Sequence, residues 1–337
     1  MVTIYDIAKK ANVSAMTVSR VINNTGNISE KTRNKVKQVM EELNYVPNRM
    51  ARSLVTQQTK ILYLLITDIT NPFYTTVSRG AEDAALKAGY CLLFGNSDEN
   101  IEKENGYINT ILTTRVDGVL IAPAGDLSLP HLQKLEQHDI PFVLLDREVP
   151  GIECDIVLGD SRDSGRRLVE YLVSQGHRDI AMINGSSSIS SARLRKQGYI
   201  DGLKIYDLPV RERYMHETGF KPAGDGSDIE AWLDQLQPFP TAIIAGNNAL
   251  AVETMRLLQA KGLHIPDDVS LVCFDELGPY SEVDPFLTVI SQQAYQFGYM
   301  GMQMLIERIQ NSTKDKPRQK IVLPSDLIIR RSVKDLS

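Results

Sequence analysis

Cysteine and histidine are scarce in this 337-residue sequence, which contains three cysteines and five histidines. Cys91, Cys154 and Cys273 are odd in number and show no CxxC spacing, and two of them fall within the apolar runs CLLF and SLVCF. Buried free thiols are therefore expected rather than disulfides. The histidines are scattered and form no HExxH motif. The sequence thus predicts no metal site and no cofactor.

Long hydrophobic runs are also absent. No apolar stretch approaches the ~20 residues that a membrane-spanning helix needs. The N-terminus is polar and does not read as a charged segment followed by an apolar leader. We therefore expect a cytoplasmic protein with no membrane partner. A bilobal solute receptor of the periplasmic type is a rival interpretation, but it would need an export signal at this end.

The common phosphate-binding and nucleophile motifs are missing. There is no GxGxxG turn after the first predicted strand, no GxxxxGK[ST] loop and no GxSxG elbow. A nucleotide-driven or hydrolytic enzyme is disfavoured, and we assign no catalytic residue. The alternative to a pure binding protein is a sugar-binding or sugar-acting α/β protein whose cleft performs chemistry.

Neither sign of charge dominates the whole chain, because 37 Lys and Arg nearly balance 42 Asp and Glu. The balance conceals a split. Residues 1–60 contain ten basic and four acidic residues, a net charge of +6, and the remainder carries −11. A basic segment attached to an acidic body is typical of a protein that meets a polyanion at one end.

Helical periodicity runs from Thr3 to about residue 44. Thr3, Ser14 and Ser29 each precede an apolar pattern with helical spacing and are expected to cap three short helices. A tight turn between the first two is typical of a helix-turn-helix. We therefore expect an all-α DNA-binding domain over residues 1–45. Pro47 ends the pattern, and residues 46–60 are expected to form a hinge linker with a conditional helix.

Apolar runs alternate with amphipathic segments after Lys60. Strands are predicted at 61–68, 90–96, 117–123 and 141–146, and in a second series at 155–160, 179–185, 213–218, 241–246 and 269–275. The intervening helices make this typical of two doubly wound α/β subdomains with parallel sheets. We expect the first subdomain to comprise residues 61–158 and 291–319, and the second to comprise 159–290 and 320–333.

Polar and aromatic side chains follow several predicted strands at the point where each strand ends. In open α/β sheets the ligand crevice lies beyond the carboxyl ends of the strands. Two such edges facing each other would form a cleft suited to a polyhydroxylated small molecule. The residues at these strand ends are Asp68, Asn71, Phe73, Asp146, Arg147, Asn247, Asn248 and Asp275.

Several segments, in order along nearly the whole chain, resemble the lactose-repressor/galactose-repressor (LacI/GalR) family of bacterial transcription regulators. They are IYDIAKKANVSAMTVSRVINN, ELNYVPNRMARSL, DITNPFY, RVDGVLI, SARLRKQGY, GLHIPDDVSLVCFDE and LPSDLIIRRS. The resemblance implies a homodimer that binds a pseudo-palindromic double-stranded operator, most often as a repressor. It also implies a periplasmic-binding-protein-like body in which a small effector, expected to be a carbohydrate, sets the operator affinity.

The resemblance places the second helix in the major groove, with Ala15, Met16 and Arg20 at base-reading positions. Arg20 is the side chain best able to discriminate, through a bidentate contact with guanine. In the hinge, Leu54 matches the family's intercalating leucine, and Ala51 and Arg49 would accompany it into the minor groove on a DNA-induced helix. Contacts to the DNA backbone or to neighbouring bases are implied for Ile4, Tyr5, Thr17, Ser19, Asn23 and Asn48.

In the body, the Arg195 guanidinium and the Asp275 carboxylate would hold adjacent hydroxyls of a sugar, with Phe220 or Phe73 against its apolar face. Asp160 is expected at or near the pocket, and Arg193 is expected to be a surface or interface charge. The effector-contacting positions implied by the resemblance are Phe73, Asp146, Arg195, Phe220, Asn247, Asp275 and Gln292.

Two departures from the family pattern affect this site. Asn248 stands where the family usually has Asp, and Cys273 stands where it commonly has Gly. The first change removes an acceptor or a helix cap. Arg195, together with Arg147 and Lys196, leaves a phosphorylated sugar or another acidic effector open.

Overall fold

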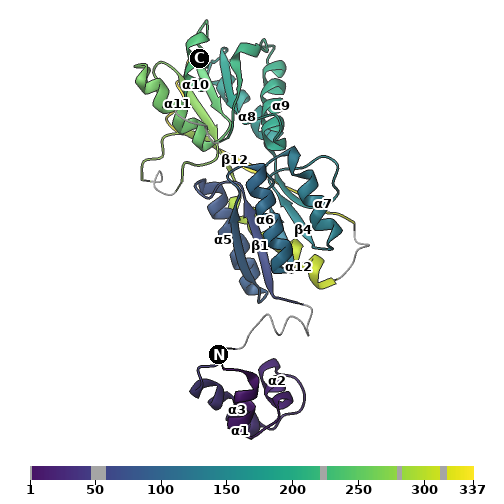
Figure 1. Ribbon diagram of the computed structural model, residues 1–337. Coiled ribbons are helices and arrows are strands. Elements are labelled where there is room, and N and C mark those ends of the chain that lie inside the picture. The colour runs from purple at the N-terminus through teal and green to yellow at the C-terminus, as the bar shows by residue number, and fades with distance from the viewer. Residues whose placement is uncertain (1, 47–57, 221–225, 279–282, 312–316) are drawn as a thin grey trace. The chain divides into compact units, whose positions relative to one another are not determined.

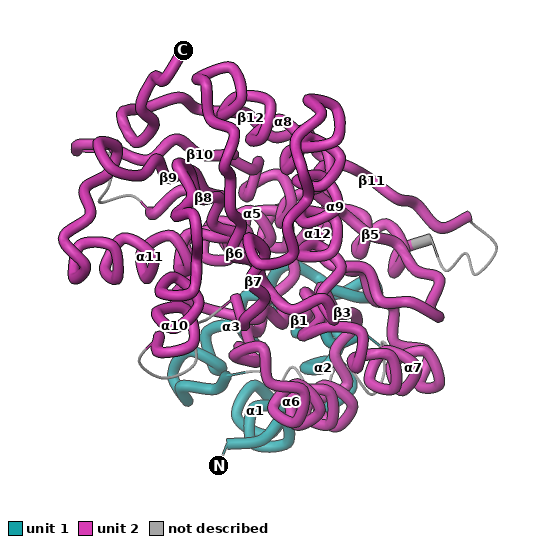
Figure 2. Tube along the Cα trace, turned by 90° about the horizontal axis from the view of Figure 1, so that it is seen from above, with its two compact units in different colours: residues 1–59 teal, residues 60–337 magenta. Residues whose placement is uncertain are grey.

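The computed structural model describes residues 2–46, 58–220, 226–278, 283–311 and 317–337. The chain forms two compact units, residues 1–59 and residues 60–337 (Figure 2). The hinge helix expected near residues 48–55 falls outside the described residues, as do the hinge positions Asn48, Arg49, Ala51 and Leu54. Each unit is described separately below.

The first unit contains the three predicted helices, α1 (Ile4–Ala11), α2 (Ala15–Asn23) and α3 (Glu30–Glu42). Each begins at the expected cap: Thr3 forms a capping box with Asp6, and the Ser14 and Ser29 hydroxyls accept the backbone N–H groups of Thr17 and Thr32. These bonds satisfy N–H groups that a helix start leaves open. The core is small and aliphatic, formed by Ile7, Ala8, Ala11, Val18, Val21, Val36 and Val39.

The second unit contains two six-stranded sheets, which define its two lobes. The first lobe has the strand order β11-β5-β4-β3-β1-β2. Its strands are β1 (Ile61–Ile66), β2 (Cys91–Asn96), β3 (Gly118–Ile121), β4 (Phe142–Leu145), β5 (Asp155–Gly159) and β11 (Lys320–Leu323). Its helices are α5 (Pro72–Lys87), α6 (Ile101–Thr114), α7 (Leu129–Gln137) and α12 (Ala294–Asn311), with a 3-10 turn at Asp126–Ser128.

The second lobe has the strand order β12-β10-β9-β8-β6-β7. Its strands are β6 (Ile180–Asn184), β7 (Met215–Glu217), β8 (Ala242–Ala245), β9 (Ser270–Phe274), β10 (Thr288–Gln292) and β12 (Ser325–Ile328). Its helices are α8 (Ser161–Ser174), α9 (Ser190–Ile205), α10 (Ser227–Gln235) and α11 (Asn248–Ala260), with a 3-10 turn at Glu212–Tyr214. The pairings of the described strands are parallel, except that β12 runs antiparallel to β10.

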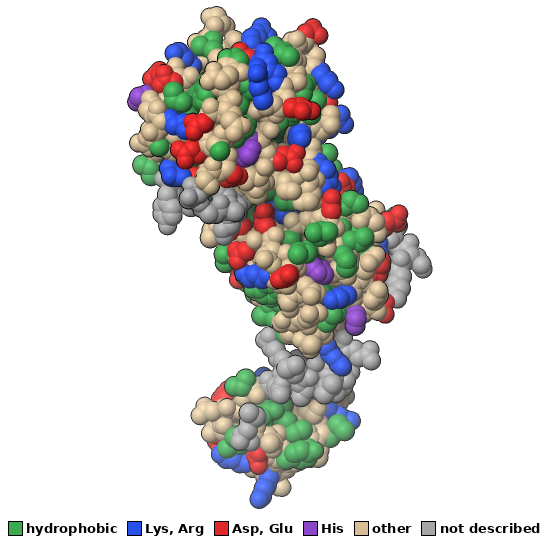
Figure 3. Space-filling model, turned by 45° about the horizontal axis from the view of Figure 1, so that its top comes forward, with side chains coloured by type: hydrophobic (Ala, Val, Ile, Leu, Met, Phe, Trp, Pro, Cys, Tyr) green, Lys and Arg blue, Asp and Glu red, His purple; other side chains and the backbone are tan. Residues whose placement is uncertain are grey.

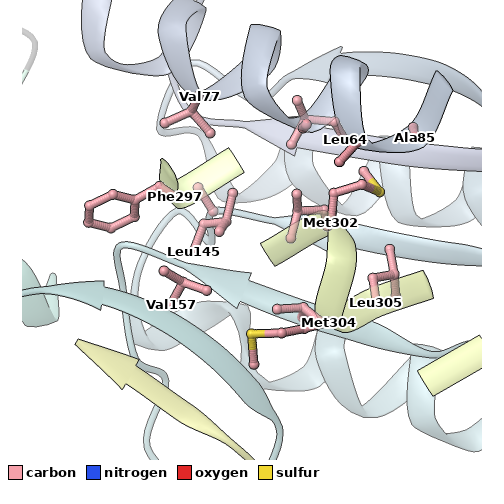
Figure 4. Packing of buried hydrophobic residues seen from close by; sticks show 14 of the residues in the cluster. Leu64, Val77, Ala85, Leu145, Val157, Phe297, Met302, Met304 and Leu305 are labelled. Atoms are coloured by element: carbon pink, nitrogen blue, oxygen red, sulfur yellow. The ribbon is translucent and has the colours of Figure 1, made fainter. Parts of the chain in front are cut away.

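Helices cover both faces of each sheet, as Figure 1 shows. In the first lobe α5 and α12 cover one face and α6 and α7 the other. The backbones of α5 and α12 lie so close that a Cβ atom built on Gly298 would stand 1.8 Å from the Val77 carbonyl oxygen. Figure 4 shows the resulting core, in which Phe297 and Met302 of α12 pack near Val77 and Leu145. In the second lobe α8 and α9 oppose α10 and α11.

The chain crosses between the lobes at three places, after β5, after β10 and between β11 and β12. Asp160 joins two of these crossings, because its carboxylate accepts the Ser325 hydroxyl at 2.5 Å and its N–H donates to the Leu323 carbonyl at 3.2 Å. Asp160, expected at or near the pocket, therefore holds the hinge between the lobes, and it is not among the side chains that line the cleft described below.

Two expectations from the sequence are wrong in detail. The second subdomain was expected to include residues 320–333, but residues 320–323 form β11 and pair with β5, so the third crossing occurs four residues later. β5, which begins the second series of apolar runs, belongs to the first sheet, in agreement with the expected bounds 61–158. Cys91 was expected to be buried, but it is exposed because β2 lies at the edge of its sheet; Cys273 is buried and Cys154 is half-buried.

Candidate functional site

Polar and aromatic side chains from both lobes meet in a cleft of the second unit. It lies beyond the carboxyl ends of the parallel strands, where such folds bind ligands. The free volume within it is about 20 Å³, room for roughly one water molecule. A wider depression of about 780 Å³ adjoins it and shares three of its side chains. The cleft brings together all seven residues expected to contact an effector: Phe73, Asp146, Arg195, Phe220, Asn247, Asp275 and Gln292.

Arg195 and Asp275 form the predicted pair in the second lobe. Arg195 is 3% exposed on α9, and its Nη2 lies 3.9 Å from Asp275 Oδ2, while its Nη1 donates to the Gly246 carbonyl. Gln292 Nε2 donates to the other Asp275 oxygen at 2.7 Å. Burial raises the pKa of Asp275, and the Arg195 charge and the Gln292 bond oppose that rise.

Asp146 and Arg147 follow β4 in the first lobe. The Tyr74 hydroxyl donates to Asp146 Oδ2 at 3.1 Å, and the Arg147 guanidinium binds Glu99 Oε1 at 2.6 Å. Tyr74 and Glu99 were not identified from the sequence, whereas Arg147 was expected at the end of its strand but was not among the effector-contacting positions. Glu99 follows β2, so the strand-end rule that selected Asp146 applies to it as well.

Phe220 lies between the two guanidinium groups. Arg147 approaches its ring from the first lobe, with 5.6 Å between the guanidinium carbon and the ring centroid, and Arg195 approaches from the second lobe at 5.4 Å. The Asn247 amide holds the Phe220 backbone by donating to its carbonyl at 2.9 Å. These are favourable cation–π distances. Phe220 is therefore the aromatic side chain that both lobes share.

The Phe73 side chain packs in the core of the first lobe and leaves little surface for a ligand. It lies at the start of α5, where Asn71 accepts its backbone N–H at 3.0 Å. Its ring packs edge-on against Tyr74 at 5.1 Å and Phe297 at 5.3 Å, and 7% of the residue is exposed. Packing in the first lobe explains most of its position, so Phe220 is the better candidate to contact a sugar face.

Asn247 and Asn248 play separate structural roles. Asn247 caps α11, because its Oδ1 accepts the Leu250 N–H at 2.8 Å. Asn248 donates to the Glu276 carbonyl at 2.9 Å and across the cleft to Asn71 Oδ1 at 3.1 Å. The amide at position 248 therefore supplies an interlobe donor, which a carboxylate at this position would not do.

A second group of interlobe bonds surrounds Arg193, and we call it the latch. Arg193 donates to both Asp126 carboxylate oxygens, at 2.7 and 3.1 Å, and the Asp126 N–H donates to the Ser188 carbonyl at 2.9 Å. The Glu148 N–H donates to Ser190 Oγ at 2.7 Å. Arg193 was expected to be a surface or interface charge, and the interface proves to be the one between the lobes.

The first unit presents the base-reading candidates on one face of α2. At 100° per residue, Met16 and Arg20 lie on the side opposite the buried Val18 and Val21, whereas Ala15 lies at the edge of that side and packs partly against the core. Met16 is 63% exposed, and Arg20 is exposed. Figure 3 shows exposed hydrophobic side chains beside Lys and Arg side chains on the visible face of this unit. Such a mixture suits contact with both base edges and phosphates.

The other described DNA-contact candidates have mixed environments. Tyr5 is 71% exposed, whereas Ile4 packs against the small core. Thr17 is engaged in the Ser14 cap, where the two hydroxyls are 2.9 Å apart. Asn23 donates to Ser19 at 3.3 Å, and both residues are half-buried. Tyr5 is therefore the most available of these side chains, and Thr17 already serves the helix.

No described helix combines the length and the apolar character needed to cross a membrane. Within the described ranges, no three His, Cys, Asp or Glu side chains gather as a metal ion would require.

Comparisons with known proteins cover the whole chain. Residues 3–48 match bacterial regulatory proteins of the lacI family, and residues 58–331 match the periplasmic binding proteins and sugar binding domain of the LacI family. The transcriptional regulator DegA of Bacillus subtilis (strain 168) is 34% identical over 337 residues, covering 99% of each chain.

Two solved structures extend the match to the fold. The Lac repressor dimer bound to operator and the anti-inducer ONPF has a TM-score of 0.83 at 27% identity, covering 99% of each chain. The complex of the transcriptional regulator CelR with cellobiose has a TM-score of 0.73 at 27% identity, covering 98% of this chain and 100% of that one. These relatives are transcription regulators rather than enzymes. The chain belongs to the lacI family of bacterial regulatory proteins, transcription regulators that join a DNA-binding helix-turn-helix to an effector-binding α/β body.

Proposed function

We propose that this protein is a cytoplasmic homodimeric repressor whose affinity for a pseudo-palindromic operator is set by a sugar or sugar derivative bound between its lobes. The observation that carries the proposal is the convergence of strand-end side chains from both lobes on one cleft. A ligand held by both lobes couples its binding to their relative position. The cellobiose complex of CelR and the operator complex of the Lac repressor dimer support the two halves of the proposal.

The cleft offers a sugar both kinds of hydrogen-bonding group. Among the described residues, Asp146 Oδ1 and the Nε atoms of Arg147 and Arg195 are buried without a hydrogen-bond partner. An unpaired buried polar atom costs free energy that a ligand hydroxyl recovers. A hydroxyl both donates and accepts, so adjacent hydroxyls match this acceptor and these donors. The Phe220 ring supplies the apolar surface.

Ligand entry requires the lobes to separate, because a free volume of about 20 Å³ does not hold a sugar. The adjoining depression, which shares Phe73, Asp275 and Gln292 with the cleft, provides an approach. A sugar changes operator affinity only if it binds the two lobe arrangements with different affinities. We propose that the arrangement selected by the sugar positions the paired DNA-binding units.

A thermal-shift screen of neutral and acidic sugars, followed by operator binding with each hit, tests the proposal. A ligand that binds the folded body at 100 times its Kd adds about 2.7 kcal/mol to the free energy of unfolding. We expect at least one sugar to raise the melting temperature and to change operator affinity. If every hit raised the melting temperature and left operator affinity unchanged, the proposed coupling would be wrong.

Replacing Arg20 with alanine should weaken binding to an operator selected by the wild-type protein by roughly 10- to 100-fold. A bidentate contact with guanine contributes about 1–3 kcal/mol of discrimination. Binding to random DNA should change much less, so the ratio of specific to non-specific affinity falls. Fluorescence anisotropy with the selected operator and with random DNA measures this ratio. Lys35→Ala, on the exposed side of α3, is the matched control and should leave that ratio unchanged.

Replacing Arg193 with alanine should destabilise the closed arrangement of the lobes. The latch pair is about one-third exposed on each side, so its loss costs about 1 kcal/mol, a factor of roughly five in the ratio of closed to open molecules. Small-angle X-ray scattering should show a more extended body. Arg166→Ala removes two comparably exposed pairs, with Asp163 and Glu170, that lie within α8, and should leave the scattering unchanged. Equal curves for the two variants would contradict the latch.

A further inference from the structure

We propose that Glu99 determines which sugars the cleft accepts: by occupying Arg147, it restricts the effector to uncharged carbohydrates and excludes sugar acids and sugar phosphates. This inference rests on the proposed function, because it concerns the ligand of the same cleft. It follows from how the two cleft guanidinium groups are already bound, and from the balance of charge around them.

Arg147 is 2% exposed and has few donors left for a ligand. Its Nη2 donates to Glu99 Oε1 at 2.6 Å, and its Nη1 donates to the carbonyls of Pro123 and Ala124 at 3.2 and 3.3 Å. An anion is held best by two parallel bonds from the guanidinium fork. The fork of Arg147 is directed to Glu99 and to backbone oxygens, so it does not present that geometry to a carboxylate or phosphate ligand.

Arg195 also lies beside a carboxylate of its own lobe, although it is paired less tightly than Arg147. It donates to the Gly246 carbonyl and faces Asp275, and its guanidinium stacks over Phe274 at 4.4 Å. The partners of Arg147 belong to the first lobe and those of Arg195 to the second. When the lobes separate, each guanidinium group therefore keeps a carboxylate of its own lobe beside it, Glu99 for Arg147 and Asp275 for Arg195, and an arriving anion has to compete with that carboxylate.

Carboxylates outnumber guanidinium groups in the cleft lining. Asp68, Glu99, Asp146 and Asp275 face it, against Arg147 and Arg195. Burial raises the pKa of Asp275, yet with Asp275 protonated three carboxylates would still face two guanidinium groups. Like charges brought together in a desolvated site repel strongly. An anionic ligand is disfavoured on this ground independently of the hydrogen bonds.

Lys196 does not supply the missing positive charge. Its Nζ binds Glu217 Oε1 at 2.7 Å, and Lys196 is not among the residues that line the cleft. In the described cleft lining, the buried side-chain atoms without a hydrogen-bond partner are Asp146 Oδ1, the Ser191 hydroxyl and the two guanidinium Nε atoms. These match neutral hydroxyls. The acidic effector that the sequence alone left open is therefore disfavoured by the tertiary arrangement.

The test compares wild type with Glu99→Gln, which keeps the size of the side chain and removes the charge that holds Arg147. The probes are glucose, galactose and cellobiose, with glucuronate, galacturonate and glucose 6-phosphate as acidic counterparts. Isothermal titration calorimetry and melting temperatures are measured for each pair. Glu102→Gln, exposed on the first turn of α6, is the matched control.

We expect wild type and Glu102→Gln to bind a neutral sugar and to bind no acidic one. Glu99→Gln should gain affinity for an acidic sugar by about tenfold or more, since one charge-assisted pair becomes available. The double variant Glu99→Gln/Arg147→Gln should lose that gain. Removing Arg147 also deprives the Pro123 and Ala124 carbonyls and the Asp146 carboxylate of a partner, so the double variant is compared at a temperature at which circular dichroism shows it folded. Loss of the gained affinity in the double variant would show that Arg147, and not a general loosening of the cleft, binds the acidic sugar.

Two results would overturn the inference. If wild type bound glucuronate, galacturonate or glucose 6-phosphate as tightly as a neutral sugar, Glu99 would not select by charge, and the proposed sugar-responsive function would stand. If no sugar of either class bound wild type or a folded Glu99→Gln, the sugar-responsive function itself would fail, and the inference with it.

Discussion

Replacing Arg195 with alanine should weaken effector binding by roughly a hundredfold. The guanidinium contacts Asp275, the Gly246 carbonyl and the Phe220 ring at the centre of the cleft. Its removal eliminates a charged donor and leaves a buried carboxylate without its counter-charge, which costs about 3 kcal/mol. Isothermal titration calorimetry with the best sugar from the screen measures the change. Operator binding without sugar should remain close to wild type, because the DNA-binding unit is untouched.

The adjacent Lys196 provides the control for this substitution. It lies on the same helix and pairs with Glu217 outside the cleft lining, so Lys196→Ala should change the effector Kd less than about twofold. Equal losses in the two variants would mean that disturbance of α9, and not the cleft contact, weakens binding. A normal Kd in Arg195→Ala would remove Arg195 from the site.

Replacing Gly298 with alanine should destabilise the second unit by about 3 kcal/mol. The new Cβ would lie 1.8 Å from the Val77 carbonyl oxygen, so α12 and α5 must separate. A second close contact between the two helices lies nearby, where a Cβ on Gly80 of α5 would stand 2.1 Å from the Tyr295 carbonyl oxygen of α12. Backbone atoms cannot move aside as the end of a flexible side chain can. Chemical denaturation followed by circular dichroism measures the change in the free energy of unfolding.

Gly106 is the matched control for the packing argument. It lies in α6, and a Cβ at this position meets no other atom within 4 Å. Alanine there should stabilise the protein by about 0.5–1 kcal/mol, because alanine is the better helix former. The two alanine substitutions should therefore change the free energy of unfolding in opposite directions. A stabilising or neutral Gly298→Ala would show that α5 and α12 do not pack by backbone contact.

The predictions that succeeded rest on local patterns. Thr3, Ser14 and Ser29 cap their helices as expected, because a cap depends on residues three or four positions away. The apolar runs became strands because buried parallel strands need continuous hydrophobic sequence. The polar residues at the strand ends could be predicted because they follow directly after these apolar runs in the sequence. The seven effector positions, implied by the resemblance, all reach one cleft, and their role in binding remains our proposal.

The errors and omissions concern partners that are distant in the sequence. Residues 320–323 were assigned to the wrong subdomain because the strand that they join, β5, lies about 160 positions earlier. Cys91 lies in an apolar run, yet an edge strand leaves it exposed. Glu99 was missed, although its pairing with Arg147, 48 residues later, changes the charge that a ligand meets.

The sequence by itself determined the capped helices, the alternation of strands and helices, the basic N-terminal segment and the family. Each depends on neighbouring residues or on ordered motifs. Only the tertiary structure decided that Arg147 and Arg195 each lie beside a carboxylate of their own lobe, that Asp160 holds the hinge and that Arg193 spans the lobes. These properties depend on which side chains meet after the two sheets come together, and the energy of a charge depends on the partners and the burial found there.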